Sequence, residues 1–309
     1  MRVPDFQGVA VLVTGGAGFI GSHLVDALVA RGARVRVLDD LSTGRKENLP
    51  DVELIEGDIR DAALCRAACE GVKYVFHQAA LGSVPRSMID PGASIAVNVT
   101  GTANVFAAAR EARRVVYASS SSVYGDGGSV VKREGEEGRP LSPYAASKAM
   151  GEELAEVFSR CYGQELIGLR YFNVYGPRQS PDGPYAAVVP RFFQACRSGE
   201  AAVIHGDGEQ SRDFTWVGDA VMANLLAAGA PPEACGRAYN VAKGERTTIK
   251  ELAERVRELV GNGLPSRHEP PRPGDVRYSQ ADTSAAEAQL GFRAEVGLRE
   301  GLERTWQSR

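Results

Sequence analysis

The sequence predicts an α/β fold in which a doubly wound parallel sheet is followed by a smaller C-terminal α/β region. Short apolar runs rich in β-branched residues alternate with stretches of helical periodicity through the first half of the chain. The first run passes into a glycine-rich turn and then into an apolar helical stripe, which is the order of a βαβ unit. From about residue 173, prolines become frequent and interrupt the regular alternation. We therefore expect a Rossmann-like domain over residues 1–172 and a second region over 173–309.

The expected strands all lie in short runs of apolar residues. They cover residues 9–14, 34–38, 52–56, 74–77, 114–118, 166–169 and 238–241, and the last is expected to return to the first domain's sheet. The expected helices cover residues 20–31, 62–69, 97–112, 143–160 and 249–259, with one more carrying Leu298, Leu302 and Trp306. Ser142 and Pro143 suit the start of a helix, and Thr248 with Glu251 forms a capping box. The proline- and arginine-rich stretch 265–275 is expected to be a loop.

Composition excludes several classes of protein. The 36 basic residues are balanced by 39 acidic ones, so no basic excess points to nucleic acid. The five scattered cysteines fit a reducing compartment, and no signal peptide or membrane span is recognisable, so we expect a cytoplasmic protein. The histidines show no metal-ligand spacing with cysteine or carboxylate, so no metal site is expected.

The glycine turn predicts a dinucleotide site. Gly15, Gly16, Gly18 and Gly21 satisfy two spacings that allow a tight turn and close approach of the backbone to a pyrophosphate. Asp39 ends the second expected strand, where a carboxylate can accept both ribose hydroxyls of NAD and repel the 2′-phosphate of NADP. Asp58 follows the third strand and could contact adenine or simply be a loop carboxylate.

Tyr144 and Lys148 lie four residues apart at the start of an expected helix, so they share one face. A phenol with a reference pKa of about 10 must ionise near neutrality to act as a base, and both the lysine and the helix N-terminus favour the phenolate. The spacing alone is common on helices. Ser120 lies in a serine run at the expected carboxyl end of a strand, where a hydroxyl can relay a proton.

Taken together, these motifs resemble the extended short-chain dehydrogenases that act on nucleotide sugars. The likeness rests on residues 14–21, Asp39, the serine run ending at Gly125, Tyr144 with Lys148, and residues 170–177 (RYFNVYGP). Within that group the chain looks most like bacterial UDP-N-acetylglucosamine/UDP-N-acetylgalactosamine 4-epimerases. The stretches 77–87 (HQAALGSVPRS), 158–163 (FSRCYG) and 185–190 (YAAVVP) carry this narrower resemblance.

The resemblance implies a division of roles among the residues. Tyr144 would take the proton from the sugar O4, Lys148 would orient the nicotinamide ribose, and Ser120 would relay the proton. The hydride would pass from C4 to NAD and return to the other face of a 4-keto sugar, so tightly held NAD would end unchanged. The implied cofactor-binding residues are Gly15, Gly18, Phe19, Ile20, Gly21, Asp39, Asp58, Ile59, Tyr144 and Lys148.

The resemblance also implies a UDP-sugar site, placed mainly in residues 173–309. Arg212 and Arg272 would bind the UDP phosphates, since guanidinium groups match phosphate oxygens, or they could form surface ion pairs. Asp275 would contact the uridine ribose and His205 would lie beside uracil. The full implied set is Ser83, Ser120, Asn173, Val188, His205, Arg212, Arg272, Asp275 and Ser279.

Three serines narrow the expected reaction and substrate. Ser121 and Ser122 stand where dehydratases of this group carry an acid and a base, so elimination is not expected. Ser279 aligns with a bulky tyrosine of strict UDP-glucose epimerases, and a small residue leaves room for an N-acetyl group. The alternatives are a UDP-glucose or UDP-glucuronate 4-epimerase, with Arg191 or Ser83 near a sugar carboxylate, and, from another class, a non-catalytic dinucleotide-binding sensor. By the same resemblance we expect a homodimer.

Overall fold

A seven-stranded parallel sheet forms the centre of the molecule, in the order β12-β7-β5-β4-β1-β2-β3. The computed structural model describes residues 3–182, 186–261, 263–271 and 277–308. The chain order reverses next to β1, where one half of the sheet continues to β2 and β3 and the other to β4. This is the doubly wound, Rossmann-like topology that the sequence predicts, with its ligand crevice at the carboxyl ends of the strands.

The described elements have the following bounds. The strands are β1 (Ala10–Thr14), β2 (Arg34–Asp39), β3 (Glu53–Glu56), β4 (Tyr74–His77), β5 (Arg114–Ser120), β6 (Val131–Lys132), β7 (Leu166–Tyr171), β8 (Val174–Tyr175), β9 (Ala201–His205), β10 (Ser211–Arg212), β11 (Thr215–Trp216), β12 (Arg237–Val241), β13 (Thr247–Thr248), β14 (Leu264–Glu269) and β15 (Gln280–Ala281). The α-helices are α1 (Phe19–Val29), α2 (Ala62–Cys69), α3 (Val84–Ile89), α4 (Pro91–Ile95), α5 (Thr102–Ala108), α6 (Pro143–Tyr162), α7 (Val188–Arg197), α8 (Val217–Gly229), α9 (Ile249–Val260), α10 (Ser284–Leu290) and α11 (Leu298–Gln307).

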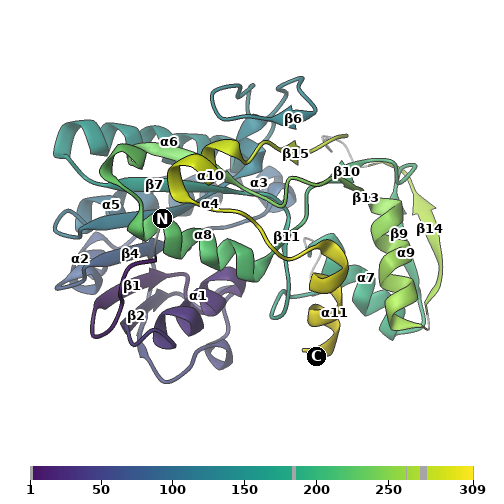
Figure 1. The fold of residues 1–309 in the computed structure, drawn as a ribbon, viewed down its shortest axis with the longest axis horizontal. Helices are drawn as coiled ribbons and strands as arrows, with labels where there is room; N and C mark the ends of the chain where they lie inside the picture. Colours follow the sequence, from purple (N-terminus) through teal and green to yellow (C-terminus); the bar gives the residue numbers. More distant parts are fainter. Residues whose placement is uncertain (1–2, 183–185, 262, 272–276, 309) are drawn as a thin grey trace.

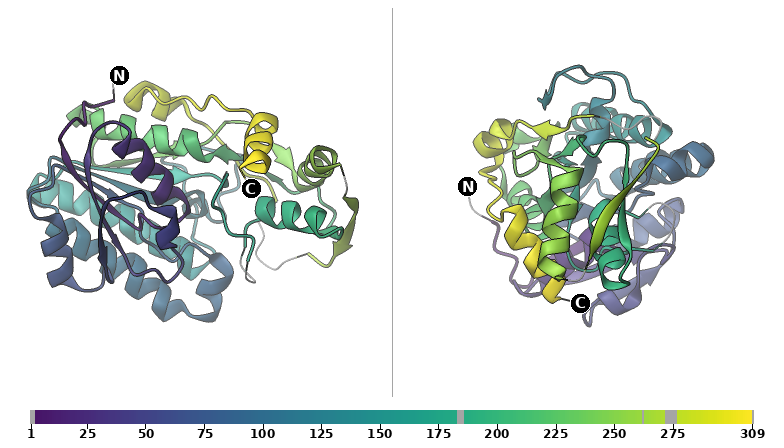
Figure 2. Two further views of the ribbon diagram at one scale, coloured as in Figure 1. Left: turned by 90° about the horizontal axis from the view of Figure 1, so that it is seen from below. Right: turned by 90° about the vertical axis from the view of Figure 1, so that its right-hand side faces the viewer.

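The two faces of the sheet bury different sets of helices (Figures 1 and 2). Successive side chains of a strand point to opposite faces, so Val11 and Val13 pack with α1, α8 and α10, whereas Leu12 packs with α2, α5 and α6. Strand β12 pairs in parallel with β7, so a segment distant in sequence completes the sheet's edge. Helices α8 and α10 from the second half of the chain thus cover the first half's sheet, and the exact division at residue 172 stays a prediction.

A smaller lobe lies beside the sheet and has its own core. Helices α7, α9 and α11 pack around the β9–β14 pair through buried side chains such as Phe193, Ile204, Val256 and Leu302. Phe19 and Ile20 at the start of α1 pack against the same core. Figure 1 shows this lobe to one side of the sheet's carboxyl edge, with the C-terminal helix α11 on its surface.

Two expectations about local structure are wrong. The stretch expected to be a loop begins with strand β14, which pairs with β9 although most of its side chains are exposed and no apolar pattern marks it. The single helix expected over 97–112 is instead a π-helical segment, Ala96–Gly101, followed by α5. Helix α5 ends at Ala108, four residues before the expected end. The chain turns there, and the Arg113 main-chain nitrogen, directly before β5, then donates a hydrogen bond to the Lys73 carbonyl.

Candidate active site

The glycine turn after β1 leaves no room for side chains. Gly15 has a φ of +67°, and a Cβ there would lie 2.6 Å from the Ala79 nitrogen. A Cβ on Gly21 would lie 2.1 Å from the Gly15 carbonyl oxygen. Gly18 immediately precedes α1, and no side chain caps the N-terminus of that helix. The first main-chain N–H groups of α1 are therefore available to bind an anion. This cradle fits a dinucleotide pyrophosphate.

Asp39 lies at the carboxyl end of β2 and is 7% exposed. Its carboxylate accepts 2.9 Å hydrogen bonds from the main-chain nitrogens of Ala17 and Leu41, and burial raises its pKa. These two bonds fix the carboxylate and leave lone pairs for ribose hydroxyls. Asp58 is engaged by Arg60, whose Nη2 lies 2.6 Å from Asp58 Oδ2 and holds the pKa of this carboxyl below its usual range.

A cavity of about 710 Å³ brings together most of the residues that the sequence singles out. Its lining includes all the expected cofactor-binding residues, together with Ser83, Ser120 and Asn173. The glycine cradle, the Asp39 carboxylate and the size of this cavity fit NAD. Asn173 lies between β7 and β8 with a φ of +27°, a strained conformation for a residue other than glycine.

Ser120, Tyr144 and Lys148 meet at the strand ends inside this cavity. Ser142 caps α6 by accepting from Ala145 N at 3.1 Å, and Pro143 occupies the first turn. The Tyr144 phenol lies beside the Ser120 side chain, whose hydroxyl donates a 3.2 Å bond to Ser122 Oγ. Lys148 Nζ donates a 2.8 Å bond to the Ala118 carbonyl, and burial lowers its pKa to about 8. The predicted α6 face is thus aimed at the end of β5.

The electrostatics of Tyr144 differ from the sequence expectation. Burial raises its pKa, and the neighbouring Ser120 hydroxyl offsets this only in part. The expectation named Lys148 and the helix N-terminus as groups that favour the phenolate, and burial acts against both of them. Ionisation of Tyr144 therefore needs additional positive charge beside it, which the oxidised nicotinamide carries when it is bound.

A second cavity of about 240 Å³ adjoins the first. It is lined by Val188, His205 and Arg212, and both cavities share Asn173, Val174, Gln179, Ala186 and Ala187. A nucleotide in the second cavity can therefore reach the first with an attached sugar. Ser279 lines neither cavity: it is 8% exposed and its main-chain nitrogen donates to the Ser211 carbonyl at 3.2 Å. Arg272 and Asp275 lie outside the described residues.

Gln179 is a site residue that the sequence analysis missed. Its Nε2 donates a 3.0 Å bond to the Val174 carbonyl, which fixes the side-chain amide. The residue lines both cavities, and its Oε1 is buried without a hydrogen-bond partner among the described residues. An unpartnered buried acceptor beside a cavity marks this residue for attention. A glutamine in a proline-rich turn carries no sequence signal for this role.

Metal-binding and membrane-spanning features are both absent from the part of the chain that the structure describes. No group of three or more His, Cys, Asp or Glu side chains there could hold a metal ion. None of the helices built from those residues is both long and apolar enough to cross a membrane.

Known proteins share both the sequence and the fold of this chain. The model of the NAD dependent epimerase/dehydratase family matches residues 11–242. The UDP-glucose 4-epimerase of Mycolicibacterium smegmatis is 41% identical over 304 residues, covering 95% of this chain and 96% of that protein. A Thermus thermophilus UDP-glucose 4-epimerase solved with NAD superposes with a TM-score of 0.89 at 39% identity, over 97% of this chain and 98% of the other. The UDP-N-acetylglucosamine 4-epimerase of Methanobrevibacter ruminantium, solved with UDP-N-acetylmuramic acid, gives 0.93 at 38% identity over 98% of both chains.

Proposed function

This chain belongs to the NAD-dependent epimerase/dehydratase family and is an NAD-dependent nucleotide-sugar 4-epimerase, and we propose that its preferred substrates are UDP-N-acetylglucosamine and UDP-N-acetylgalactosamine. The observation that carries the proposal is the continuity of the two cavities, which lets a nucleotide in the smaller one present its sugar to Tyr144 in the larger one. The likeness to an enzyme named for UDP-N-acetylglucosamine supports an acetamido sugar. The role of Ser279 stays a prediction from the sequence, because this residue lines neither cavity.

The reaction needs a proton and a hydride to leave the same carbinol group. NAD supplies reversible hydride exchange at C4 when it is bound. Tyr144 takes the O4 proton as phenolate, and the Ser120 hydroxyl, which lines the same cavity, carries the proton between sugar and tyrosine. Lys148 is a buried cation one turn further along α6, and it stabilises the phenolate and orients the cofactor ribose.

Inversion requires the keto sugar to present its other face to the same residues. Arg212 and His205 hold the nucleotide end in the smaller cavity while the sugar turns in the larger cavity. Arg272 and Asp275 are assigned to the nucleotide by the resemblance in sequence alone. Tyr144 then returns its proton to O4 through Ser120. Ser121 and Ser122 carry no carboxylate beside the relay hydroxyl, so the residues offer no acid and base pair for loss of water.

The decisive experiment supplies purified protein, without added NAD, with UDP-N-acetylglucosamine, UDP-glucose and UDP-glucuronate in separate reactions followed by proton NMR. We expect C4-inverted product from all productive substrates and the highest kcat/KM for the N-acetyl sugar. A higher value for UDP-glucose or UDP-glucuronate would contradict the substrate proposal. Ser279→Tyr should depress acetamido turnover more than UDP-glucose turnover, and equal effects would contradict the role of Ser279.

We also propose that the protein is a homodimer, on the basis of its exposed apolar side chains, and that it works in a reducing compartment, the cytoplasm, on the basis of its cysteines. Met150 and Val157 lie seven residues apart on α6 and are both exposed, and Met88 and Ile89 at the end of α3 are 63% and 74% exposed. Exposed apolar side chains on two helices that contact each other suit a subunit interface. All five cysteines are free. Light scattering that gives the mass of a single chain would contradict the dimer.

A further inference from the structure

A buried charged network lies directly behind the proposed catalytic residues, and the reaction derived above does not use it. Glu152 lies on α6 one turn after Lys148 and two turns after Tyr144, so the three side chains share a face. Arg170 of β7 donates to the Glu152 carboxylate from Nε at 2.9 Å and from Nη2 at 2.6 Å. The Ser119 hydroxyl donates to the same carboxylate. Arg170 is 6% exposed, so the pair is removed from water.

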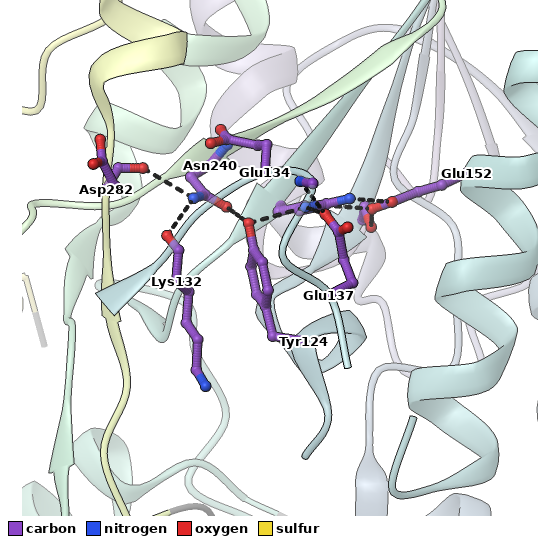
Figure 3. A network of polar contacts seen from close by, with 10 residues as sticks. Tyr124, Lys132, Glu134, Glu137, Glu152, Asn240 and Asp282 are labelled. Atoms are coloured by element: carbon purple, nitrogen blue, oxygen red, sulfur yellow. Dashed lines mark hydrogen bonds and ion pairs between the residues drawn. The ribbon is translucent and has the colours of Figure 1, made fainter. Parts of the chain in front are cut away.

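Arg170 also contacts a second group of side chains, which includes Tyr124, Glu137 and Asn240. Figure 3 labels these residues and their partners. The Nη1 of Arg170 donates to the Tyr124 hydroxyl at 2.9 Å and to Glu137, which comes from the segment before α6. The Tyr124 hydroxyl donates to Asn240 Oδ1 at 2.7 Å. The Asn240 side-chain amide in turn donates to the carbonyls of Lys132 and Asp282. The chain of bonds therefore joins α6, β7, β12 and the segment after β15.

The groups around Lys148 and Glu152 come from every element packed there. They are Tyr144 on α6, His77 on β4, Tyr117 on β5, Tyr124 after β5, Arg170 on β7 and Glu137 in the segment before α6. Burial raises the pKa of the three tyrosines and lowers that of His77 to about 3, so all four are uncharged near neutrality. The cations that remain are Lys148 and Arg170, and the carboxyl groups that face them are Glu152, Glu137 and Glu134, the last of which follows β6 and accepts from the Asn240 main-chain nitrogen.

We propose that Glu152 is a positioning residue of the active site, which provides the countercharge of Lys148 and, through Ser119 and Arg170, holds the end of β5 that carries Ser120. The inference rests on the role proposed above for Lys148. Two facts support it. Lys148 is buried with its Nζ on the Ala118 carbonyl of β5, and Glu152 lies one turn further along the same face of α6. The bond from Ser119 ties the same carboxylate to the residue preceding the relay serine.

Removal of the Glu152 charge has a definite consequence for Lys148. Burial alone disfavours the ammonium, and the carboxylate opposes this effect. In Glu152→Gln the positive charge of Arg170 would face Lys148 with less compensation. Lys148 would then lose its proton at a lower pH. Because the reaction needs the ammonium, activity would also be lost at a lower pH than in the wild type.

The test follows Lys148 directly as well as through activity. Protein labelled with ¹³C at the lysine Cε is titrated by NMR, and the Lys148 signal is assigned with Lys148→Arg. In Glu152→Gln we expect the Lys148 midpoint and the alkaline limb of kcat to fall together by roughly one pH unit. Tyr124→Phe is the matched control, because it removes one bond to Arg170 without changing charge, and its Lys148 midpoint should equal that of the wild type.

The outcomes separate the proposal from a structural role and from the proposed function. A folded Glu152→Gln with an unchanged Lys148 midpoint overturns the inference, whatever its activity. If this variant does not fold, Glu152→Asp keeps the charge and should titrate as the wild type does, and a fall of its midpoint would overturn the inference. Absence of epimerase turnover in the wild type would contradict the proposed function but leave the titration interpretable.

Discussion

The ammonium of Lys148 donates a 2.8 Å hydrogen bond to the main-chain carbonyl of Ala118, two residues before Ser120 on β5. This bond fastens the catalytic face of α6 to the carboxyl end of a central strand. It also fixes the lysine one helical turn from Tyr144, which lines the same cavity as Ser120. Contacts within the protein itself therefore bring α6, the carboxyl end of β5 and Ser120 together.

Tyr144→Phe should abolish most turnover and leave nucleotide binding intact. The substitution removes the group that accepts the O4 proton in our proposal, so kcat should fall by about 10²- to 10⁴-fold. Steady-state kinetics and calorimetry with UDP measure the two properties separately. Tyr162→Phe, on the exposed end of the same helix, is the control and should behave as the wild type. Retained turnover in Tyr144→Phe would refute its role as base.

Gly21→Ala should prevent the glycine turn from closing. The added Cβ would meet the Gly15 carbonyl at 2.1 Å, a backbone contact that no side-chain movement can relieve. We expect loss of copurified NAD and a lower melting temperature. Gly151→Ala in α6 is the matched control, since nothing lies within 4 Å of its new Cβ, and it should change the free energy of unfolding by at most about 1 kcal/mol, in the stabilising direction. A Gly21→Ala enzyme that still holds NAD would contradict this reading of the turn.

Asp39→Asn should weaken NAD binding by roughly 10- to 100-fold, because hydrogen bonds to a charged acceptor contribute about 1.5–3 kcal/mol. The asparagine side chain would keep the shape of the aspartate but lose the charge that excludes a 2′-phosphate. The ratio of NAD to NADP affinity, measured on protein stripped of cofactor, should therefore fall. An unchanged ratio would show that Asp39 does not discriminate between the two cofactors.

Asp213 predicts a pH-dependent stability of unusual sign. Burial raises its pKa to about 7, although the main-chain nitrogens of Lys243, Gly244 and Ala281 donate to it. The folded state therefore binds more protons than the unfolded state between about pH 4 and pH 7, and this group's contribution to the free energy of unfolding falls as pH rises through that window. In urea unfolding, the free energy of unfolding of Asp213→Asn relative to the wild type should rise from pH 4 to 7 and stay constant above pH 7. A constant difference across the window would contradict a raised pKa.

The parts of the fold that the sequence predicts correctly are those with local causes. Ser142 and Pro143 begin α6 where expected, and Thr248 with Glu251 forms both bonds of the capping box of α9. Within the glycine turn, the contact of Gly21 with the Gly15 carbonyl is likewise local. Such signals need no knowledge of the rest of the chain, so the order of strands and helices in the Rossmann-like half follows from them.

The parts that sequence reasoning missed depend on tertiary surroundings. Helix α8 is buried on nearly every side by α1 and the sheet, so it has no amphipathic stripe to mark it. Strand β14 is exposed and polar, and only its pairing with β9 makes it a strand. Gln179 acquires its unpartnered oxygen, and Tyr144 its raised pKa, from burial that no local pattern records.

The central claim is that a hydride leaves C4 and returns to the opposite face of the same carbon within one active site. Epimerisation of UDP-N-acetylglucosamine carrying deuterium at C4, run in ordinary water and followed by NMR and mass spectrometry, tests it most directly. The account predicts UDP-N-acetylgalactosamine that keeps the deuterium at C4. Product that has lost the label to solvent would contradict it, because proton exchange with water, and not a returned hydride, would then have inverted the carbon.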